Sequence, residues 1–206
     1  MSNSTRMPRK WTTFQLVFLP VCAALNVGVG AVVGVVKLPL YLDSIGTFIA
    51  AALGGWLYGS VAGLLSLVLA AVLIAPTSPA YAGTAIVIAI LVAVFTRYGF
   101  LRSIVPTIIG GLIIGVAAAL VSAPVTTYLY GGVSLVGSDA ATAFFKAMGN
   151  TILESVIFGG LATDPVDKLL TALITLGILK ALPGRLFQRF RNGHRFAKRV
   201  TPDDAS

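Results

Sequence analysis

Polar and ionisable side chains lie beside long apolar runs of this chain, and their chemistry suits the capture of a small solute. Ionisable groups close to such runs are energetically costly and usually mark a pathway or a binding site. Carboxylates, an amide, an ammonium group and phenol rings could together orient a polar ring compound and stack on it. The candidate substrate-binding residues are Tyr41, Asp43, Tyr128, Tyr130, Asn150, Glu154, Asp167 and Lys168.

Each of these residues also has a purely structural interpretation. Asn150 and Glu154 are four residues apart and would share one face of a helix, where they could bind a solute or only pair with each other. Asp43, reinforced by Ser44, could cap one helix, and Asp164 could cap another. Pairing with other loop charges or anchoring at the membrane interface would account equally for Asp167, Lys168, Tyr128 and Tyr130.

Several kinds of chemistry lack their residues in this sequence. Cys22 is the one cysteine and His194 the one histidine, so we expect no disulfide and no metal site. The sequence contains no Walker A loop and no nucleophile elbow. We therefore expect no cofactor and no enzymatic activity. The first five apolar runs also lack central acidic residues, which disfavours a carrier driven by protons or sodium ions.

The composition is that of a protein embedded in a membrane. Of the 206 residues, 57% are hydrophobic and 11% are charged, and the mean hydropathy is +0.93. Soluble domains carry roughly 25% charged residues. At about 20 residues for each membrane crossing, the chain has room for several spans and none for a separate soluble catalytic domain. The net charge of +8 comes from basic residues beside the apolar runs, so nucleic acid is not an expected partner.

Proline and glycine breaks divide the apolar sequence into helices. Pro39 ends the first run, a break near residues 54–59 divides the second, and Pro124 ends a later run. Asp164 followed by Pro165 predicts the start of the last helix. The predicted helices cover 12–36, the two halves of 45–75, 83–95, 103–123 and 165–182.

Basic residues orient these helices. Three Lys or Arg residues precede the first run, and seven follow from Lys180 onward, so both ends are predicted to be cytoplasmic. Two ends on the same side of the membrane require an even number of crossings. The moderately apolar stretch 140–160 is therefore expected to re-enter the membrane or to pack outside it.

The predicted fold class is an all-α integral membrane protein. It is a six-transmembrane-helix bundle with an extra non-spanning or re-entrant helix before the last span. The predicted domains are a cytoplasmic tail at 1–11, the membrane domain at 12–183 and a basic cytoplasmic tail at 184–206. We expect the protein in the plasma membrane.

Three local patterns resemble the substrate-binding (S) components of energy-coupling factor (ECF) transporters. Residues 39–47, PLYLDSIGT, resemble the outer loop and the start of the second helix of that family. Residues 54–64, GGWLYGSVAGL, resemble its tight turn into the third helix. Residues 164–168, DPVDK, followed by an apolar helix that ends at Pro183, resemble its final helix. The resemblance covers about residues 12–183.

This resemblance implies capture without chemistry. The S component would bind a vitamin, a vitamin precursor or a similar small solute on the outside, with residues 37–47 as a lid. It would then associate with a membrane scaffold subunit and two cytoplasmic ATPases that drive release inside. The family carries an Ala-x-x-x-Ala docking motif in its first helix. Its nearest match here runs from Ala24 to Gly28, and such small residues also suit packing within the bundle.

Two other classes of protein remain open at this point. A membrane sensor or assembly protein would use the same small-residue faces without transporting a solute. A membrane enzyme would use Asp164, Asp167 and Lys168, but no nucleophile or metal accompanies them. The charge of a solute is open as well. Glu154 and Asp167 would suit a cationic heterocycle, whereas Lys146 and Lys168 would suit an anion.

Overall fold

The computed structural model describes residues 11–36, 40–133 and 139–196. Within these ranges the chain forms helices and turns and no strand, as predicted. The elements are α1 (Thr13–Val36), α2 (Ile45–Gly54), α3 (Trp56–Leu73), η1 (Ser78–Tyr81), α4 (Ala82–Thr96), α5 (Ile104–Tyr130), α6 (Asp139–Ala147), α7 (Ile152–Ala181), α8 (Gly184–Phe187) and η2 (Gly193–Arg195).

Four stretches of helix are long and apolar enough to cross a membrane. They are α1, α3, the continuous stretch Ser78–Thr96 made by η1 and α4, and α5. The remaining two predicted spans differ in kind. With 10 residues, α2 is about 15 Å long, half of a hydrocarbon core. In contrast, α7 has 30 residues but carries charged side chains within it. The structure supports a membrane protein, and the number of spans stays a prediction.

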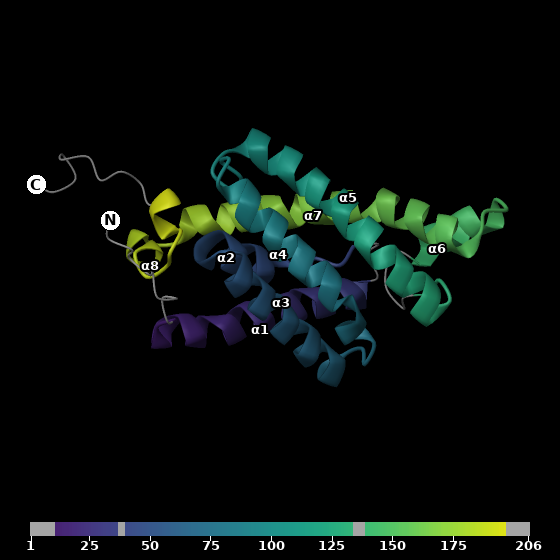
Figure 1. Cartoon of the computed structure of the whole chain (residues 1–206), viewed down its shortest axis with the longest axis horizontal. Coiled ribbons are helices and arrows are strands. Elements are labelled where there is room, and N and C mark those ends of the chain that lie inside the picture. The colour runs from purple at the N-terminus through teal and green to yellow at the C-terminus, as the bar shows by residue number, and fades with distance from the viewer. Residues whose placement is uncertain (1–10, 37–39, 134–138, 197–206) are drawn as a thin grey trace, which may run out of the picture.

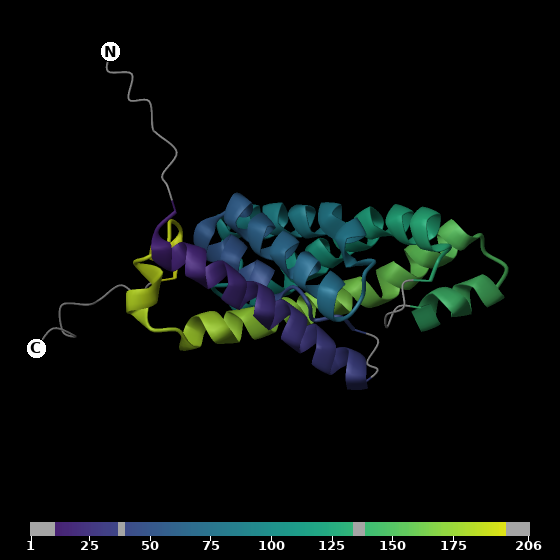
Figure 2. The ribbon, with the colours of Figure 1, turned by 90° about the horizontal axis from the view of Figure 1, so that it is seen from below.

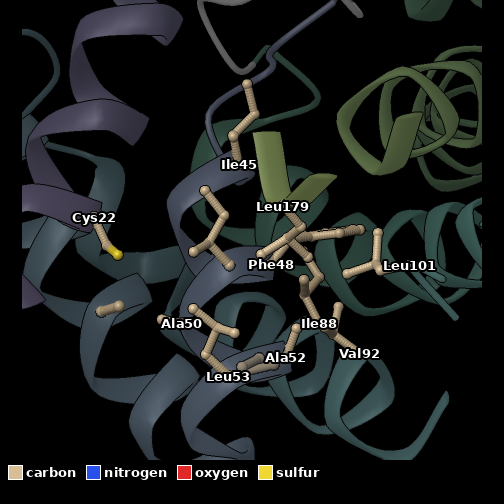
Figure 3. Close-up of a cluster of buried hydrophobic side chains, with 14 of the residues drawn as sticks. Cys22, Ile45, Phe48, Ala50, Ala52, Leu53, Ile88, Val92, Leu101 and Leu179 are labelled. Carbon is tan, nitrogen blue, oxygen red and sulfur yellow. The ribbon is translucent and has the colours of Figure 1, made fainter. Parts of the chain in front are cut away.

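The short helix α2 forms the centre of the bundle. Every residue from Ile45 to Leu53 is buried, and α1, α3, α4 and α7 all contact this helix. Figure 3 shows Phe48, Ala50 and Leu53 of α2 among side chains from the surrounding helices. A glycine permits the close approach of α1, because a Cβ at Gly46 would overlap the carbonyl group of Cys22.

Both described ends of the chain lie at one end of the bundle, with α6 at the other (Figures 1 and 2). The side chain of Gln15 donates to the carbonyl oxygen of Arg189 at 2.7 Å. The backbone of Asn192 donates to the carbonyl oxygen of Leu53 at 2.9 Å. Phe190 is buried there among the rings of Phe14, Phe18 and Tyr58. Residues 184–196, expected as part of a basic tail, thus pack against the bundle. Residues 1–10 and 197–206 lie outside the described ranges.

The predicted start of the last helix is wrong. Helix α7 begins at Ile152 and continues through Asp164 and Pro165 to Ala181. Pro124 likewise lies inside α5, which the sequence pattern ended there. The two helices pack closely, since a Cβ at Gly115 of α5 would overlap Pro165 Cα and lie 2.6 Å from the carbonyl oxygen of Asp164. This close packing against α5 stabilises α7 at Pro165, where proline would otherwise interrupt the helix.

The stretch 140–160, expected as one non-spanning helix, belongs to two helices. Helix α6 ends at Ala147, a turn follows, and α7 begins at Ile152. Helix α6 folds back along the first half of α7 (Figure 2). A Cβ at Gly159 would lie 2.6 Å from the hydroxyl of Thr142, so glycine permits this contact. A short helix before the final long one is therefore present, but its bounds differ from the prediction.

One face of α1 has no partner within the described chain. Its buried residues, such as Cys22 and Asn26, point toward α2 and α3. Ala24 and Gly28, the predicted docking residues, are exposed on the opposite face, and no atom lies within 4 Å of a Cβ at Gly28. The internal-packing interpretation therefore does not hold for this pair.

Candidate functional site

A cavity of about 180 Å³ lies toward the end of the bundle that carries α6. Its wall comes from the segment before α2 and from α2, α3, η1, α4, α5, α6 and α7. Apolar residues such as Leu67, Ile88 and Val156 form part of the wall. The remainder is polar and consists of Tyr41, Asp43, Ser44, Thr47, Ser66, Thr77, Ser78, Tyr81, Thr84, Ser122, Thr126, Thr142, Asp164 and Lys168.

Asp167 fixes the segment that enters α2. Its side chain is fully buried, and one carboxylate oxygen accepts hydrogen bonds from the backbone N–H groups of Tyr41 at 2.7 Å and Leu42 at 2.8 Å. Leu42 has a φ of 48°, a left-handed conformation that is uncommon for leucine. Two adjacent N–H groups thus converge on one carboxylate, which holds this part of the cavity wall in place.

Lys168 is held by three of its neighbours. The ammonium group donates to the second carboxylate oxygen of Asp167 and to Ser44 Oγ at 3.2 Å, and it lies 3.6 Å from a carboxylate oxygen of Asp43. It also lies 5.8 Å from the ring centre of Tyr41. An ammonium group has three protons to donate. Two of these protons are donated in hydrogen bonds, and Asp43 at 3.6 Å forms an ion pair that is too long for a third hydrogen bond.

Asp164 differs from the other carboxylates of the site. It lies one helical turn before Lys168 on α7, lines the cavity, and is only 7% exposed. Among the described side chains, the ion pairs join Lys168 to Asp43 and Asp167, so Asp164 takes part in none. A buried charge normally has a partner. Asp164 therefore presents to the cavity a buried carboxyl group that has no ion-pair partner within 4 Å among the described residues.

A hydrogen-bonded network between α1, α2 and α3 supports one side of the cavity. The amide nitrogen of Asn26 donates to Thr47 Oγ1 at 2.9 Å and to Ser66 Oγ at 3.2 Å. Its amide oxygen accepts from the backbone N–H of Gly46 at 2.6 Å. Thr47 and Ser66 line the cavity, so Asn26 positions both hydroxyl groups from behind.

Two tyrosines support the opposite side. The hydroxyl of Tyr81 lies 3.1 Å from Thr126 Oγ1, and both residues line the cavity. The ring of Tyr130 stacks on that of Tyr81 with centroids 6.1 Å apart. Its hydroxyl donates to the carbonyl oxygen of Thr77 at 3.0 Å. Tyr130 therefore positions Tyr81 without lining the cavity itself.

Only some of the predicted site residues come together. Tyr41, Asp43 and Lys168 line the cavity. Asp167 lies behind them and binds Tyr41 and Lys168. Tyr130 contributes through Tyr81, as described above.

The other three predicted residues lie apart from the cavity wall. Tyr128 is 76% exposed. Asn150 precedes α7, and its amide donates to the carbonyl oxygen of Phe145 at 2.9 Å. Glu154 is exposed and forms a capping box with Thr151. Its carboxylate accepts hydrogen bonds from the backbone N–H and the hydroxyl of Thr151 at 2.9 and 2.8 Å. The expected shared helix face of Asn150 and Glu154 is wrong, because the helix begins between them.

Several cavity residues had no distinct signal in the sequence. Ser66, Thr84 and Thr142 are single hydroxyl residues in apolar helices, and such residues often bond only to their own helix. Tyr81 follows a turn rich in proline, which resembles an ordinary interfacial position. The capping box at Thr151 and Glu154 was readable, since Thr-x-x-Glu before an apolar run is its pattern.

The arrangement suits reversible binding of a small polar solute. It combines apolar walls, many hydroxyl groups and a buried carboxyl group without an ion pair in a partly open cavity. In the parts of the chain that the structure describes, no group of three or more His, Cys, Asp or Glu side chains could hold a metal ion. Comparisons with protein-family models, curated proteins and solved structures find no match for this chain.

Proposed function

We propose that this chain is the membrane-embedded substrate-capture subunit of an ECF-type importer. It binds a vitamin, a vitamin precursor or a similar small solute on the extracellular side and delivers it together with an ATPase module. The observation that carries the proposal is the partly open cavity between the segment before α2 and helices α2 to α7, whose mainly apolar surface carries several hydroxyl groups and a carboxylate. The sequence resemblance to S components supports the same function.

The distribution of basic residues supports the proposed orientation. Arg97 and Arg102 lie in the turn between α4 and α5, and further arginines lie in residues 184–196. These segments lie toward the end of the bundle opposite α6 (Figure 1). Under the positive-inside rule this end faces the cytoplasm, and the cavity then lies toward the outside. Six crossings, made by α1 to α5 and α7, would place both termini inside.

The unpartnered face of α1 supports docking to a scaffold subunit. Ala24 and Gly28 lie on this face with Val21 and Val35, which are 57% and 83% exposed. Small residues let helices approach closely within lipid. The chain has no nucleotide-binding motif of its own, so two cytoplasmic ATPase subunits would supply the energy. No catalytic residue and no cofactor belong to this proposal.

Ligand-induced stabilisation tests capture. The purified protein is heated with each member of a panel of vitamins, vitamin precursors and nucleobases. A ligand present at 100 times its dissociation constant stabilises the folded state by about 2.7 kcal/mol, which raises the unfolding temperature measurably. A folded protein that responds to no member of the panel would contradict solute capture and favour a sensor or assembly protein.

Association with the importer provides the second test. The chain is co-expressed with a scaffold subunit and its two ATPases and is purified in mild detergent. Wild-type protein should retain all three subunits and support ATP-dependent uptake of the ligand found above. Binding of a solute without retention of these subunits would favour a sensor that uses the same cavity.

A further inference from the structure

The charges around the cavity do not favour an anionic solute. The sequence offered two lysines, Lys146 and Lys168, that could have bound an anion. Lys146 lies exposed on α6 and is not part of the cavity wall. Lys168 touches the cavity, but Asp167, Asp43 and Ser44 already take its ammonium group. An incoming anion would have to compete with the carboxylates of Asp43 and Asp167 for this one ammonium group.

Among the described residues at this site, the acidic groups exceed the basic ones. Three carboxylates, Asp43, Asp164 and Asp167, surround a single ammonium group. Asp167 is engaged twice over, by Lys168 and by two backbone N–H groups. Asp43 is half exposed and shares Lys168. The carboxylate of Asp164 is therefore the buried acidic group with which a positively charged solute in the cavity would form an ion pair.

The surroundings of Asp164 suit an organic cation more than a bare metal ion. The cavity volume of about 180 Å³ exceeds that of one dehydrated ion, and apolar residues such as Ile88 and Val156 form part of its wall. The hydroxyl groups of Ser122, Thr126 and Thr142 come from two different helices and accept or donate hydrogen bonds. The ring of Tyr81 adds an aromatic surface, which attracts cations.

From this geometry we infer that the solute is a small organic cation. It is a protonated amine or a positively charged nitrogen heterocycle, and its charged nitrogen pairs with Asp164 while its polar substituents bond to the hydroxyl groups of the wall. This inference rests on the proposed function, because it assigns a substrate class to the same cavity. It excludes carboxylate and phosphate solutes of similar size.

A series of compounds matched in shape and differing in charge tests the inference. The probes are the aminomethyl, hydroxymethyl and carboxyl derivatives of pyridine, pyrimidine and thiazole, together with their N-methylated cations. They are measured on wild-type protein alongside the vitamin panel, by thermal stability and by calorimetric titration. Sodium, potassium and calcium ions are titrated separately. Because the series is measured on wild-type protein, the inference is testable even if a variant fails to fold.

Two variants locate the charge that matters. Asp164→Asn removes the charge with almost no change of shape, and Glu154→Gln makes the same change at an exposed site outside the cavity wall. We expect only cationic members to bind wild-type protein. Their affinity should fall about 30-fold or more in Asp164→Asn, which is the lower end of the effect of removing one partner of a buried charge pair. It should change less than about twofold in Glu154→Gln.

The outcomes separate the inference from the proposed function. If neutral or anionic members bind as well as cations, or if Asp164→Asn leaves cation binding unchanged, the inference is wrong and solute capture stands. A response to an inorganic ion alone would also overturn it. If neither the matched series nor the vitamin panel binds to folded protein, solute capture itself is refuted, and the inference falls with it.

Discussion

Replacement of Asp167 by alanine should destabilise the protein strongly, although this side chain only lies behind the cavity wall. The carboxylate is fully buried and bonds to Lys168 and to the backbone N–H groups of Tyr41 and Leu42. Its removal leaves the ammonium group of Lys168, itself 5% exposed, with only Ser44 and a more distant Asp43. It also releases the segment that leads into α2.

The expected loss follows from these contacts. Removal of one partner of a buried ion pair costs about 3–5 kcal/mol, because the other charge stays buried without compensation. Each orphaned N–H group adds about 1–3 kcal/mol if it stays buried. Tyr41 and Leu42 are only half-buried, so water can reach them after a small movement. We therefore expect Asp167→Ala to lower the free energy of unfolding by about 3–5 kcal/mol.

A double variant separates charge from hydrogen bonding. In Asp167→Asn with Lys168→Met both charges disappear, while the asparagine oxygen can still accept from Tyr41 and Leu42. Replacing both charged partners by uncharged groups is far less costly than removing one. The double variant should recover at least half of the loss seen in Asp167→Ala. Unfolding in mixed micelles with increasing dodecyl sulfate, followed by circular dichroism, measures both.

Two results would refute this reasoning. If Asp167→Ala loses less than about 1 kcal/mol, the buried pair does not contribute as its geometry implies. If the double variant is no more stable than Asp167→Ala, the uncompensated ammonium group of Lys168 is not the source of the loss.

Three further predictions concern packing, hydrogen bonding and docking. Gly115→Val should prevent stable folding, because its Cβ would overlap Pro165 of α7. Gly177→Val on the same helix pair should fold, since nothing lies within 4 Å of a Cβ there. Size-exclusion chromatography after mild heating distinguishes the two variants. Asn26→Ala should lower the free energy of unfolding by about 1–3 kcal/mol or more in the same assay, because it leaves the buried N–H of Gly46 without its acceptor. A smaller loss would contradict the role assigned to Asn26. Gly28→Phe should leave stability and ligand binding unchanged but abolish retention of the scaffold subunit, and retention at the wild-type level would remove this face from the proposed docking site.

The early part of the fold was predictable because local sequence signals agree with the packing there. The break between α2 and α3 falls at Gly55, whose φ of +96° is a conformation that only glycine adopts readily. Long apolar runs bounded by such breaks gave α1, α3 and α4 with small errors at their ends. The burial of α2 could not be predicted from its own residues, because an apolar helix in the core and an apolar helix in lipid have the same composition.

The late part of the fold depended on contacts that the sequence does not reveal. Pro165 lacks a backbone N–H and disfavours helix in the residue before it, so a helix start was the natural interpretation. The packing of Gly115 against Pro165 belongs to two segments 50 residues apart. Such a tertiary contact outweighs the local preference of proline against helix, and no local sequence pattern predicts the contact. The same reason explains why α5 continues through Pro124.

Prediction of the site failed where one residue type has two common roles. Thr163 and Thr96 are helical hydroxyl residues that bond to the carbonyl oxygen four residues earlier, whereas Thr84 and Thr142 line the cavity. Sequence alone gives all four the same appearance. The acidic residues were easier to find, since a charge in an apolar chain is rare, but their division into roles required the geometry.

Asp164 and Asp167 provide the sharpest test of that division, because they are three residues apart on one helix and differ in their partners. Asp167 has lost its hydration and gained an ammonium group and two N–H groups, so its removal should destabilise the fold. Asp164 has lost most of its hydration without gaining an ion pair, and a buried charge of that kind lowers stability. Asp164→Asn should therefore leave the free energy of unfolding of the unliganded protein equal or slightly higher, while it reduces the stabilisation that a bound cation gives. A loss comparable to that of Asp167→Ala, measured in the same dodecyl sulfate titration without ligand, would make Asp164 a structural residue and remove the physical basis for a solute that binds to it.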